Sequence, residues 1–355
     1  MTAVHVVVPD AVHDTRRPSG GNTYDRRVCS GLAALGWSVH EHAAPGSWPD
    51  PDAAALAALS GILAEIPDGA LVLVDGLIAS AVPELLTPQS SRLCLVVLVH
   101  MPLGGGLPGG DAVLSRAREG AALAAAAAVV TTSGWTRAWL LDTYALPPGR
   151  VHVAEPGVDV AEPAGGTRGG GELLCVGAYT RAKGYDVLLA ALATVKDLPW
   201  RCVCVGTQSA DSSFVDHLGR AAAAAGVEDR VRFTGPLTGG DLDRAYASAD
   251  VLVLASRAET YGMVVTEALG RGLPVIGTDV GGLPEALGHA ADGSRPGLLV
   301  PPGDPWRLAV ALRSWLTDPD LRDRLRLAAR ERRTTLSPWS DTSARISRVL
   351  LEVAG

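Results

Sequence analysis

Short apolar segments alternate with helix-forming segments along most of the chain, and this alternation limits the possible folds more than any other feature. In the first half, apolar strands are predicted at residues 3–9, 37–42, 70–76, 92–100 and 128–133. Helices are predicted between them, for example at residues 22–35 and 53–66. Strands joined through helices form right-handed crossovers, which lay the strands parallel in one sheet. The first half is therefore predicted to be an α/β/α domain.

The alternation stops once and then begins again. Residues 161–171, AEPAGGTRGGG, are rich in glycine and lack periodicity, which is typical of a flexible linker. After them, apolar strands are predicted at residues 172–178, 200–206, 230–235 and 251–256. A chain of 355 residues is also longer than one hydrophobic core usually organises. We therefore expect two α/β/α domains of similar plan, with a ligand site where the carboxyl ends of their strands face each other across a cleft.

Composition excludes several classes of protein. The formal charge of −7 argues against nucleic acid as a partner. No apolar run approaches the ~20 residues needed to span a bilayer, so membrane association is not favoured. The first ten residues, MTAVHVVVPD, have no basic segment before a long apolar core and are interpreted as a strand, not as a signal peptide. The five cysteines, an odd number in mostly apolar segments, indicate reduced thiols in a cytoplasmic protein.

Two carboxylates lie eight positions apart across a predicted junction between a strand and a helix. Glu259 closes the loop after strand 251–256, and Glu267 lies two turns into a helix predicted at residues 262–272. Glu267 is not on the apolar stripe of that helix, so core packing does not explain it. One interpretation pairs it with Arg271 at i, i+4, worth only ~0.3–0.5 kcal/mol. The other places both glutamates at the carboxyl end of a parallel sheet, where they accept hydrogen bonds from ligand hydroxyls.

The segment from Glu259 to Glu267 resembles the E-x7-E motif of retaining GT-B glycosyltransferases of the GT4 family, and GTDVGGLPE at residues 277–285 resembles the turn that follows it there. The resemblance implies that Glu259 holds hydroxyls of the donor sugar and Glu267 the ribose. It also implies that the backbone N–H groups of Thr260, Tyr261, Gly262 and Met263 bind sugar and phosphate. The segment that ends at Leu237, residues 234–237, would meet the nucleobase.

Lys183 follows the predicted strand 172–178 at the start of a helix. A cation in a first turn opposes the helix dipole and needs another reason, and a lysine there can neutralise a diphosphate leaving group. The sequence departs from the family here, since Ala178 stands where GT4 enzymes usually carry an arginine. Arg181 lies near enough in sequence to substitute for it from a different angle.

The first half carries two further candidates. Gly20 and Gly21 precede the first predicted helix, either as an ordinary turn or as a close approach to phosphate, and Asn22 is expected to cap that helix. His100 ends the strand at residues 92–100 and is either a satisfied histidine at a strand end or a donor to a sugar hydroxyl. The resemblance favours the second interpretation for each. The glycine-rich residues 101–110 are predicted to shape an acceptor pocket.

The family resemblance also implies the domain boundaries. It gives an N-terminal, acceptor-side Rossmann-like domain at residues 1–160, a linker at 161–171 and a C-terminal, donor-side Rossmann-like domain at 172–338. Residues 339–355 form an amphipathic helix that, in GT-B enzymes, crosses back onto the first domain. Two Asp-x-Asp pairs, at Asp50 and Asp52 and at Asp241 and Asp243, lie at predicted helix starts and are interpreted as caps. No catalytic metal or other cofactor is expected.

The function predicted from these features is transfer of a sugar from a UDP- or GDP-sugar to an acceptor hydroxyl, with retention at the anomeric carbon. Retention comes from the resemblance alone. Two alternatives remain open at this level. One is a sugar-nucleotide epimerase or hydrolase on the same two-domain plan, and the other is a non-catalytic nucleotide-sugar binder, which Ala178 favours slightly. Dependence of donor turnover on an added acceptor distinguishes both from a transferase.

Overall fold

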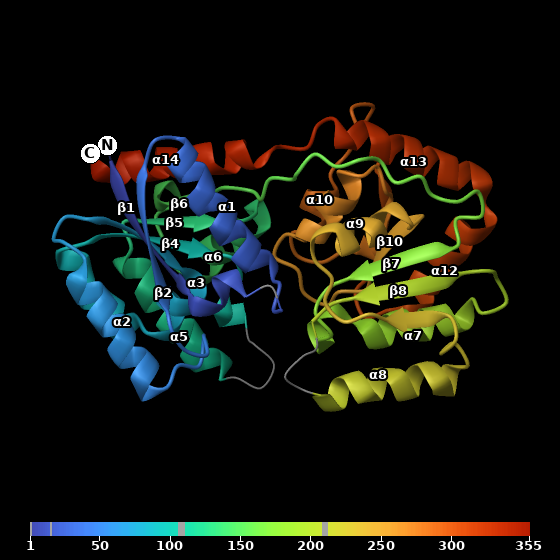
Figure 1. The fold of residues 1–355 in the computed structure, drawn as a ribbon, viewed down its shortest axis with the longest axis horizontal. Coiled ribbons are helices and arrows are strands. Elements are labelled where there is room, and N and C mark those ends of the chain that lie inside the picture. Colours follow the sequence, from blue (N-terminus) through green and yellow to red (C-terminus); the bar gives the residue numbers. More distant parts are fainter. Residues whose placement is uncertain (1, 15, 106–110, 208–211) are drawn as a thin grey trace. The chain divides into compact units, whose positions relative to one another are not determined.

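The computed structural model describes residues 2–14, 16–105, 111–207 and 212–355. The chain divides into two compact units. The N-terminal unit contains the segment that ends at Asp14, together with Ser19–Gly157 and Ser337–Gly355, and the C-terminal unit is built on Val158–Leu336. Each unit has its own parallel sheet with helices on both faces, as Figure 1 shows.

The sheet of the N-terminal unit has the order β2-β1-β3-β4-β5-β6, and all of its strands run parallel. Its strands are β1 Ala3–Pro9, β2 Ser38–Ala44, β3 Leu71–Asp75, β4 Cys94–Val99, β5 Ala128–Thr131 and β6 Val151–Val153. Its helices are α1 Gly20–Ala34, α2 Ala53–Glu65, α3 Gly76–Ala81, α4 Pro83–Leu86, α5 Ala112–Ala125, α6 Gly134–Thr143 and α14 Trp339–Ala354. Every strand predicted in this half is present, although most are shorter than the apolar segment that predicted them.

Side chains that alternate along β1 divide the core of this unit into two layers. Val4 and Val6 pack with residues of α1 and α14, whereas Val7 packs with residues of α2 and α3. The last helix of the chain therefore completes the hydrophobic core of the first unit, and Figure 1 shows α14 beside α1 with the two chain ends close together. A hydrogen bond from Trp37 Nε1 to Ser347 Oγ, 2.9 Å long, fixes α14 against the turn before β2.

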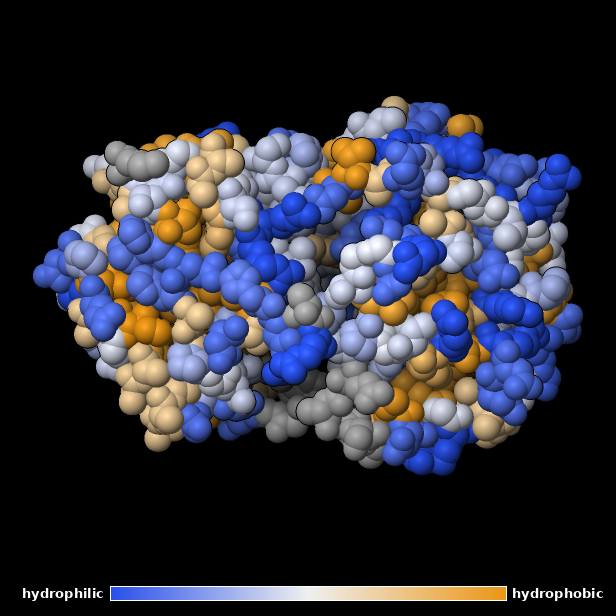
Figure 2. Space-filling model, viewed as in Figure 1, coloured by the Kyte–Doolittle hydropathy of each residue, from blue (hydrophilic) through white to orange (hydrophobic). Residues whose placement is uncertain are grey.

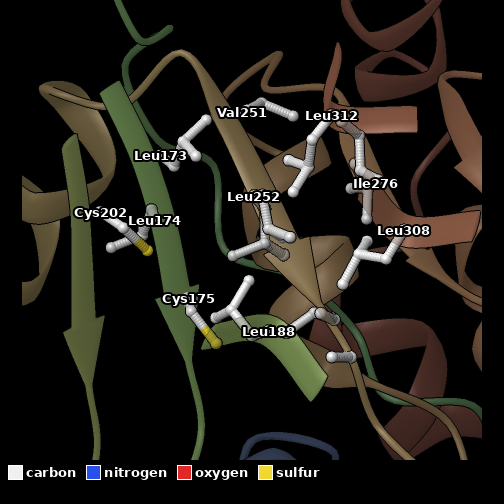
Figure 3. Close-up of a cluster of buried hydrophobic side chains, with 14 of the residues drawn as sticks. Leu173, Leu174, Cys175, Leu188, Cys202, Val251, Leu252, Ile276, Leu308 and Leu312 are labelled. Carbon is white, nitrogen blue, oxygen red and sulfur yellow. The ribbon is translucent and has the colours of Figure 1, made fainter. Parts of the chain in front are cut away.

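The sheet of the C-terminal unit has the order β12-β11-β10-β7-β8-β9, again all parallel. Its strands are β7 Glu172–Val176, β8 Arg201–Val205, β9 Val231–Phe233, β10 Val251–Leu254, β11 Val275–Thr278 and β12 Gly297–Val300. Its helices are α7 Tyr185–Thr194, α8 Ser212–Ala225, α9 Gly239–Ala247, α10 Met263–Leu269, α11 Leu283–Leu287, α12 Pro305–Thr317 and α13 Pro319–Arg333. Figure 3 shows part of its buried core, with Leu173 of β7, Leu252 of β10, and Leu308 and Leu312 of α12 among the labelled side chains.

The glycine-rich segment at residues 161–171 has no regular secondary structure, but it is held on the C-terminal unit. Buried Asp250 accepts hydrogen bonds from the hydroxyl of Thr167 at 2.7 Å and from the backbone N–H of Glu172 at 2.9 Å. The indole N–H of Trp315 donates to the carbonyl of Gly170 at 2.7 Å. Composition predicted flexibility here because it cannot show a buried carboxylate at position 250.

Several helix boundaries differ from the sequence prediction. The helix expected to begin at Lys183 begins at Tyr185, because Gly184 adopts the left-handed conformation (φ 65°) and separates a short 3-10 turn, Arg181–Lys183, from α7. The helix predicted at residues 262–272 is also shorter, Met263–Leu269.

The capping predictions are partly wrong. Asn22 does not cap α1, since Ser19 is the N-cap and accepts from the backbone N–H of Asn22. Asp52 does cap α2. Asp241 and Asp243 do not cap α9, because Thr238 occupies the N-cap position. They form ion pairs with arginines instead.

The surface in Figure 2 is mostly hydrophilic, with hydrophobic residues scattered among polar ones. In the described ranges, no helix is both long and apolar enough to cross a membrane.

Candidate functional site

The loops after β7 and β10 meet where the strand order of the C-terminal sheet reverses. β7, the first strand of this unit, has β8 on one side and β10 on the other, so the chain leaves its carboxyl end in one direction and returns on the other side. In open parallel sheets, ligands bind beside the carboxyl ends of strands at such a switch point. Lys183 lies on the loop after β7, and Ser256 and Glu259 lie on the loop after β10.

The two residues predicted to act at the sugar and the diphosphate are in direct contact. The ammonium Nζ of Lys183 lies 2.5 Å from Oε1 of Glu259, and the hydroxyl of Ser256 donates to the same oxygen at 2.9 Å. The Glu259 side chain is only 8% exposed, whereas that of Lys183 is 29% exposed. Burial of a carboxylate is costly unless a cation and hydrogen-bond donors pair with it. The ammonium of Lys183 therefore contacts the buried Glu259 carboxylate on one side and remains accessible to solvent on the other.

Backbone contacts hold the two loops together. The N–H of Arg257 donates to the carbonyl of Ala182 at 2.7 Å, and its guanidinium makes a two-pronged ion pair with Asp186 at 2.8 and 2.6 Å. Gly184 lies so close that a Cβ there would be 1.9 Å from the carbonyl oxygen of Ala255. The position of Lys183 relative to Glu259 is thus set by backbone packing and not by flexible side chains alone.

The paired glycines of GTDVGGLPE support the Glu259 loop from behind. Gly281 has φ 57°, and a Cβ there would lie 1.7 Å from the carbonyl oxygen of Glu259. A Cβ on Gly282 would lie 2.2 Å from the carbonyl oxygen of Thr260, and the N–H of Gly282 donates to Glu259 at 2.9 Å. Both positions exclude larger residues, which is a physical reason for this motif to follow the glutamates.

Glu267 does not form the i, i+4 ion pair with Arg271. Its Oε2 accepts from the hydroxyl of Tyr246 of α9 at 2.8 Å, while Arg271 pairs with Asp243 and stacks on Tyr246 at 4.5 Å from the ring centre. Burial raises the pKa of Glu267, and the Tyr246 hydroxyl and Arg271 offset part of that rise. Arg271 pairs with Asp243 because α9 brings that carboxylate beside α10. The local sequence around Arg271 does not reveal this neighbour.

Replacement of Tyr246 by phenylalanine tests the importance of this contact. Tyr246→Phe keeps the buried ring but removes the hydroxyl that orients the Glu267 carboxylate, at a cost of about 1–3 kcal/mol where a buried acceptor loses its partner. We expect weaker nucleotide-sugar binding and a smaller change in kcat, measured by titration and by steady-state kinetics. Tyr24→Phe, in the other unit, is the matched control, and equal loss of binding in both variants would contradict this role for Tyr246.

A cavity of about 440 Å³ opens between β9 and α9. Thr234 and Leu237, from the segment predicted to meet a nucleobase, belong to its wall. The other residues of the wall are Val203, Arg232, Phe233, Asp241, Arg244, Ala245 and Ser248. The wall combines an aromatic ring, aliphatic groups and hydrogen-bonding groups, which suits a flat polar ligand.

Other residues predicted to bind the donor also lie in the C-terminal unit, but they differ in burial and in the side chains they contact. The guanidinium of Arg181 lies over the ring of Phe214 of α8, 5.1 Å from its centre. Tyr261 is buried, and Met263 is half-buried at the start of α10. The structure therefore brings Lys183 to Glu259, whereas Arg181 contacts α8.

In the N-terminal unit, His100 is held by two buried carboxylates. Its Nε2 lies 2.8 Å from Oδ1 of Asp25 on α1 and 3.7 Å from Oδ2 of Asp75 at the end of β3. The ring packs edge-on against Tyr24, and a Cβ on Gly21 would lie 3.5 Å from its Cδ2. Gly20 and Gly21 lie in the first turn of α1. The two predicted features of this unit, the glycine pair and the histidine, are thus neighbours.

The charges in this cluster are strongly coupled. Burial by itself lowers the pKa of His100, but the charge and hydrogen bond of Asp25 and the charge of Asp75 outweigh it and raise the pKa to about 9. Burial and the charge of Asp25 raise the pKa of Asp75 to about 7. His100 is therefore an imidazolium at neutral pH, able to donate from both ring nitrogens. The three groups also lie close enough to hold a metal ion, although the imidazolium already balances one of the two carboxylate charges.

Sequence reasoning missed Asp25, Asp75 and Glu119. Asp75 ends an apolar strand, and this placement at the carboxyl edge of the sheet was the available signal. Glu119 is fully buried on α5, where it accepts from the backbone N–H groups of Leu103 and Gly104 at 2.8 and 2.9 Å and from the hydroxyl of Tyr144 at 2.7 Å. It fixes the start of the glycine-rich loop. Residues 106–110 of that predicted acceptor loop lie outside the described residues.

Comparison with known proteins finds similarity to glycosyltransferases. Residues 167–332 match the family model for glycosyl transferases group 1. A D-inositol 3-phosphate glycosyltransferase of Salinispora tropica is 34% identical over 57% of this chain and 46% of its own length, and one of Salinispora arenicola is 35% identical over 61% and 52%. The chain thus spans about half the length of these curated relatives.

Solved structures resemble nearly the whole chain. Sucrose-phosphate synthase from Thermosynechococcus elongatus has a TM-score of 0.81 at 22% identity and covers 99% of both chains. Anabaena Alr3699/HepE in complex with UDP-glucose has a TM-score of 0.79 at 16% identity, covering 99% of this chain and 100% of its own. At such identities the likeness shows the fold, which is that of GT-B proteins with two Rossmann-like α/β units. The region that matches the family model for glycosyl transferases group 1, residues 167–332, carries Lys183, Glu259 and Glu267.

Proposed function

We propose that this protein is a glycosyltransferase that moves a sugar from a nucleoside diphosphate sugar to an acceptor hydroxyl with retention at the anomeric carbon. The contact between Lys183 and Glu259 at the switch point of the C-terminal sheet carries the proposal. It supports the proposal because a cation and a hydrogen-bond acceptor lie together at the kind of sheet edge where ligands bind. The names of the curated relatives and the UDP-glucose bound by HepE support the same class of reaction.

The proposed chemistry assigns a separate task to each group. Lys183 neutralises negative charge that develops on the departing diphosphate, which is the main electrostatic demand of the step. Glu259 accepts hydrogen bonds from hydroxyls of the transferred sugar, and Glu267 accepts from those of the ribose. The cavity wall at Thr234 and Leu237 receives the nucleobase. His100, as an imidazolium, donates a hydrogen bond to a sugar hydroxyl.

Retention without a protein nucleophile implies a front-face reaction. The acceptor oxygen forms its bond to the anomeric carbon on the side from which the diphosphate oxygen leaves, and the acceptor proton passes to the departing phosphate. No residue is assigned as a covalent nucleophile, because Glu259 is engaged by Lys183 and Ser256. No metal or other cofactor is assigned to this step.

Donor turnover with and without an acceptor tests the proposal. The purified chain is incubated with UDP-glucose, GDP-mannose and related donors, and released nucleoside diphosphate is measured before and after addition of a cyclitol or glycoside panel. A transferase releases diphosphate in proportion to the new glycoside formed. Equal turnover without acceptor would indicate a hydrolase, interconversion of the sugar an epimerase, and tight binding without turnover a nucleotide-sugar binder. Each of these results would contradict the proposal.

The two lysines of the chain allow a direct test of donor placement. Of 31 lysine and arginine residues only Lys183 and Lys196 are lysines, and Lys196 is exposed in the turn that follows α7. Acetylation followed by mass spectrometry therefore reports on both at once. We expect a bound nucleoside diphosphate to slow labelling of Lys183 and to leave Lys196 unchanged. Equal labelling of Lys183 with and without ligand would remove it from the proposed diphosphate site.

A further inference from the structure

Three of the eight histidines lie together on one face of the N-terminal sheet, at the edge of the sheet away from the residues assigned to catalysis. β1 and β2 run parallel with His5 opposite His40 and Val7 opposite His42. Residues two apart on a strand point to the same face, and directly paired residues on neighbouring strands share it. His5, His40 and His42 therefore project side by side, and we name them the β1–β2 histidine cluster.

The rings of this cluster are in close contact. Nδ1 of His5 lies 2.9 Å from Nε2 of His42. The ring of His5 is also centred 4.9 Å from that of His40 and 5.2 Å from that of His42, with interplanar angles of 21° and 15°. The ring of His5 thus stands within reach of both others. His40, on the edge strand β2, is exposed, whereas His5 and His42 are half-buried.

The electrostatic surroundings of His5 and His42 favour their neutral imidazoles. Burial lowers the pKa of His5, and the neighbouring rings of His42 and His40 lower it further. Burial and His40 likewise lower the pKa of His42, against a small opposite effect of Glu65 at the end of α2. Among the described residues, no carboxylate lies within 4.0 Å of a nitrogen of these rings. Unlike His100, none of the three is held as an imidazolium by an acid.

The facing nitrogens of His5 and His42 share a hydrogen bond, and the same separation is also compatible with two ligands of one metal ion. Two nitrogen ligands of one metal ion, each bonded at ~2.0–2.1 Å, lie roughly 2.9–3.4 Å apart for angles between those of square and tetrahedral coordination. The 2.9 Å between His5 and His42 falls in this range. The Ser38 hydroxyl, 3.2 Å from Nε2 of His40, is a weak partner that a metal could replace.

We propose that the β1–β2 histidine cluster binds one divalent first-row transition metal ion of the Zn²⁺, Ni²⁺ and Cu²⁺ group. Neutral imidazole is the side chain these ions share as a preferred ligand. His5 and His42 supply the first two nitrogens, and rotation of the exposed His40 ring supplies the third. The hydrogen now shared between Nδ1 of His5 and Nε2 of His42 moves to the far nitrogen of its own ring, so both facing atoms present lone pairs. Such an ion would tie the edge strand β2 to β1.

Calorimetric titration of the tag-free chain with ZnCl₂ and NiCl₂ near neutral pH tests this site. We expect one ion per chain, and loss of one ligand in His5→Gln or His42→Gln to weaken binding by at least ~10-fold, the lower limit seen even for groups that only orient a ligand. Because an ion that binds the folded state stabilises it, Tm should rise with Zn²⁺ in the unaltered chain and not in the double variant His5→Gln/His42→Gln.

Two control variants locate the ion. His217→Gln removes an exposed histidine of α8 in the other unit, and it should leave the affinity unchanged. Asp25→Asn alters the cluster of Asp25, Asp75 and His100, whose ligand atoms already lie within 4.8 Å of one another, and should also leave the affinity unchanged. Absence of binding, unchanged affinity in the double variant, or loss of binding in Asp25→Asn would each overturn the proposal. None of these results bears on sugar transfer, which is assigned to other residues.

Discussion

Replacement of Lys183 by alanine should lower kcat for sugar transfer by about 10²–10³-fold, the loss typical when one preorganised group that stabilises developing charge is removed. The ammonium lies 2.5 Å from Glu259 and is positioned by loops whose backbones are packed together. No other lysine lies near this loop, since Lys196 is the only other one in the chain. Steady-state rates of nucleoside diphosphate release with saturating donor and acceptor measure the effect.

Glu259→Gln should produce a loss of similar size for a different reason. The amide keeps the shape of the side chain but loses the charge that holds Lys183, and it replaces one acceptor by a donor. Lys196→Ala is the matched control for Lys183→Ala, because Lys196 is exposed and is assigned no role in the site. Circular dichroism and thermal melting of each variant separate loss of function from loss of fold. If Lys183→Ala and Glu259→Gln both fold and both keep rates within twofold of the unaltered chain, these assignments are refuted.

Asp25→Asn should lower the pKa of His100 from about 9 toward or below its ordinary value of 6.5, because Asp25 supplies both the nearest charge and a hydrogen bond. The unaltered His100 binds its proton more tightly in the folded than in the unfolded state. Its contribution to stability is therefore fully present below the unfolded pKa of 6.5 and is lost as pH rises through about 9. That contribution is at most roughly 3 kcal/mol at 1.36 kcal/mol per pKa unit.

The raised pKa of Asp75 also makes the folded state less stable as pH rises, but over a lower pH range. This carboxyl also binds its proton more tightly when folded, so the unfolding free energy falls as pH rises from 3.8 toward about 7. Histidine NMR titration gives the pKa of His100, and denaturant unfolding across this pH range gives the stability. Glu41→Gln is the matched control, since Glu41 pairs with the exposed His13. An unchanged His100 titration in Asp25→Asn would contradict the role assigned to Asp25.

Much of the fold could be predicted because its signals are local. The apolar segments at residues 3–9 and 251–256 and the helices between such segments follow from hydrophobic periodicity, and the crossover rule then makes the sheets parallel. Glu259 and Lys183 could be singled out for a related reason. They follow strands, so they lie at the carboxyl edge of a sheet whatever the details of packing. The resemblance to GT4 enzymes supplied roles for them, which no local pattern contains.

The errors have an equally physical origin. Asn22 was expected to cap α1, but Ser19 does so, because either residue type suits an N-cap and only the backbone decides where the helix begins. Lys183 was placed in a helix because Gly184 and its left-handed backbone cannot be distinguished in sequence from an ordinary loop glycine. Asp25 went unnoticed because a single aspartate on a helix usually faces water, whereas here it is buried against His100.

By itself the sequence determined the two α/β units, the strand ends at which chemistry is placed and the segment that carries both glutamates. Only the tertiary structure decided which charged groups are partners. Lys183 and Glu259 are 76 positions apart, and Asp25 and His100 are 75 apart. Each pair forms because strand order brings two loop or helix starts to one edge of a sheet. The packing of α9 beside α10 likewise pairs Arg271 with Asp243, so Glu267 accepts a hydrogen bond from Tyr246 instead. Such choices depend on the energy of burying charge beside a particular neighbour, which no local pattern in the chain specifies.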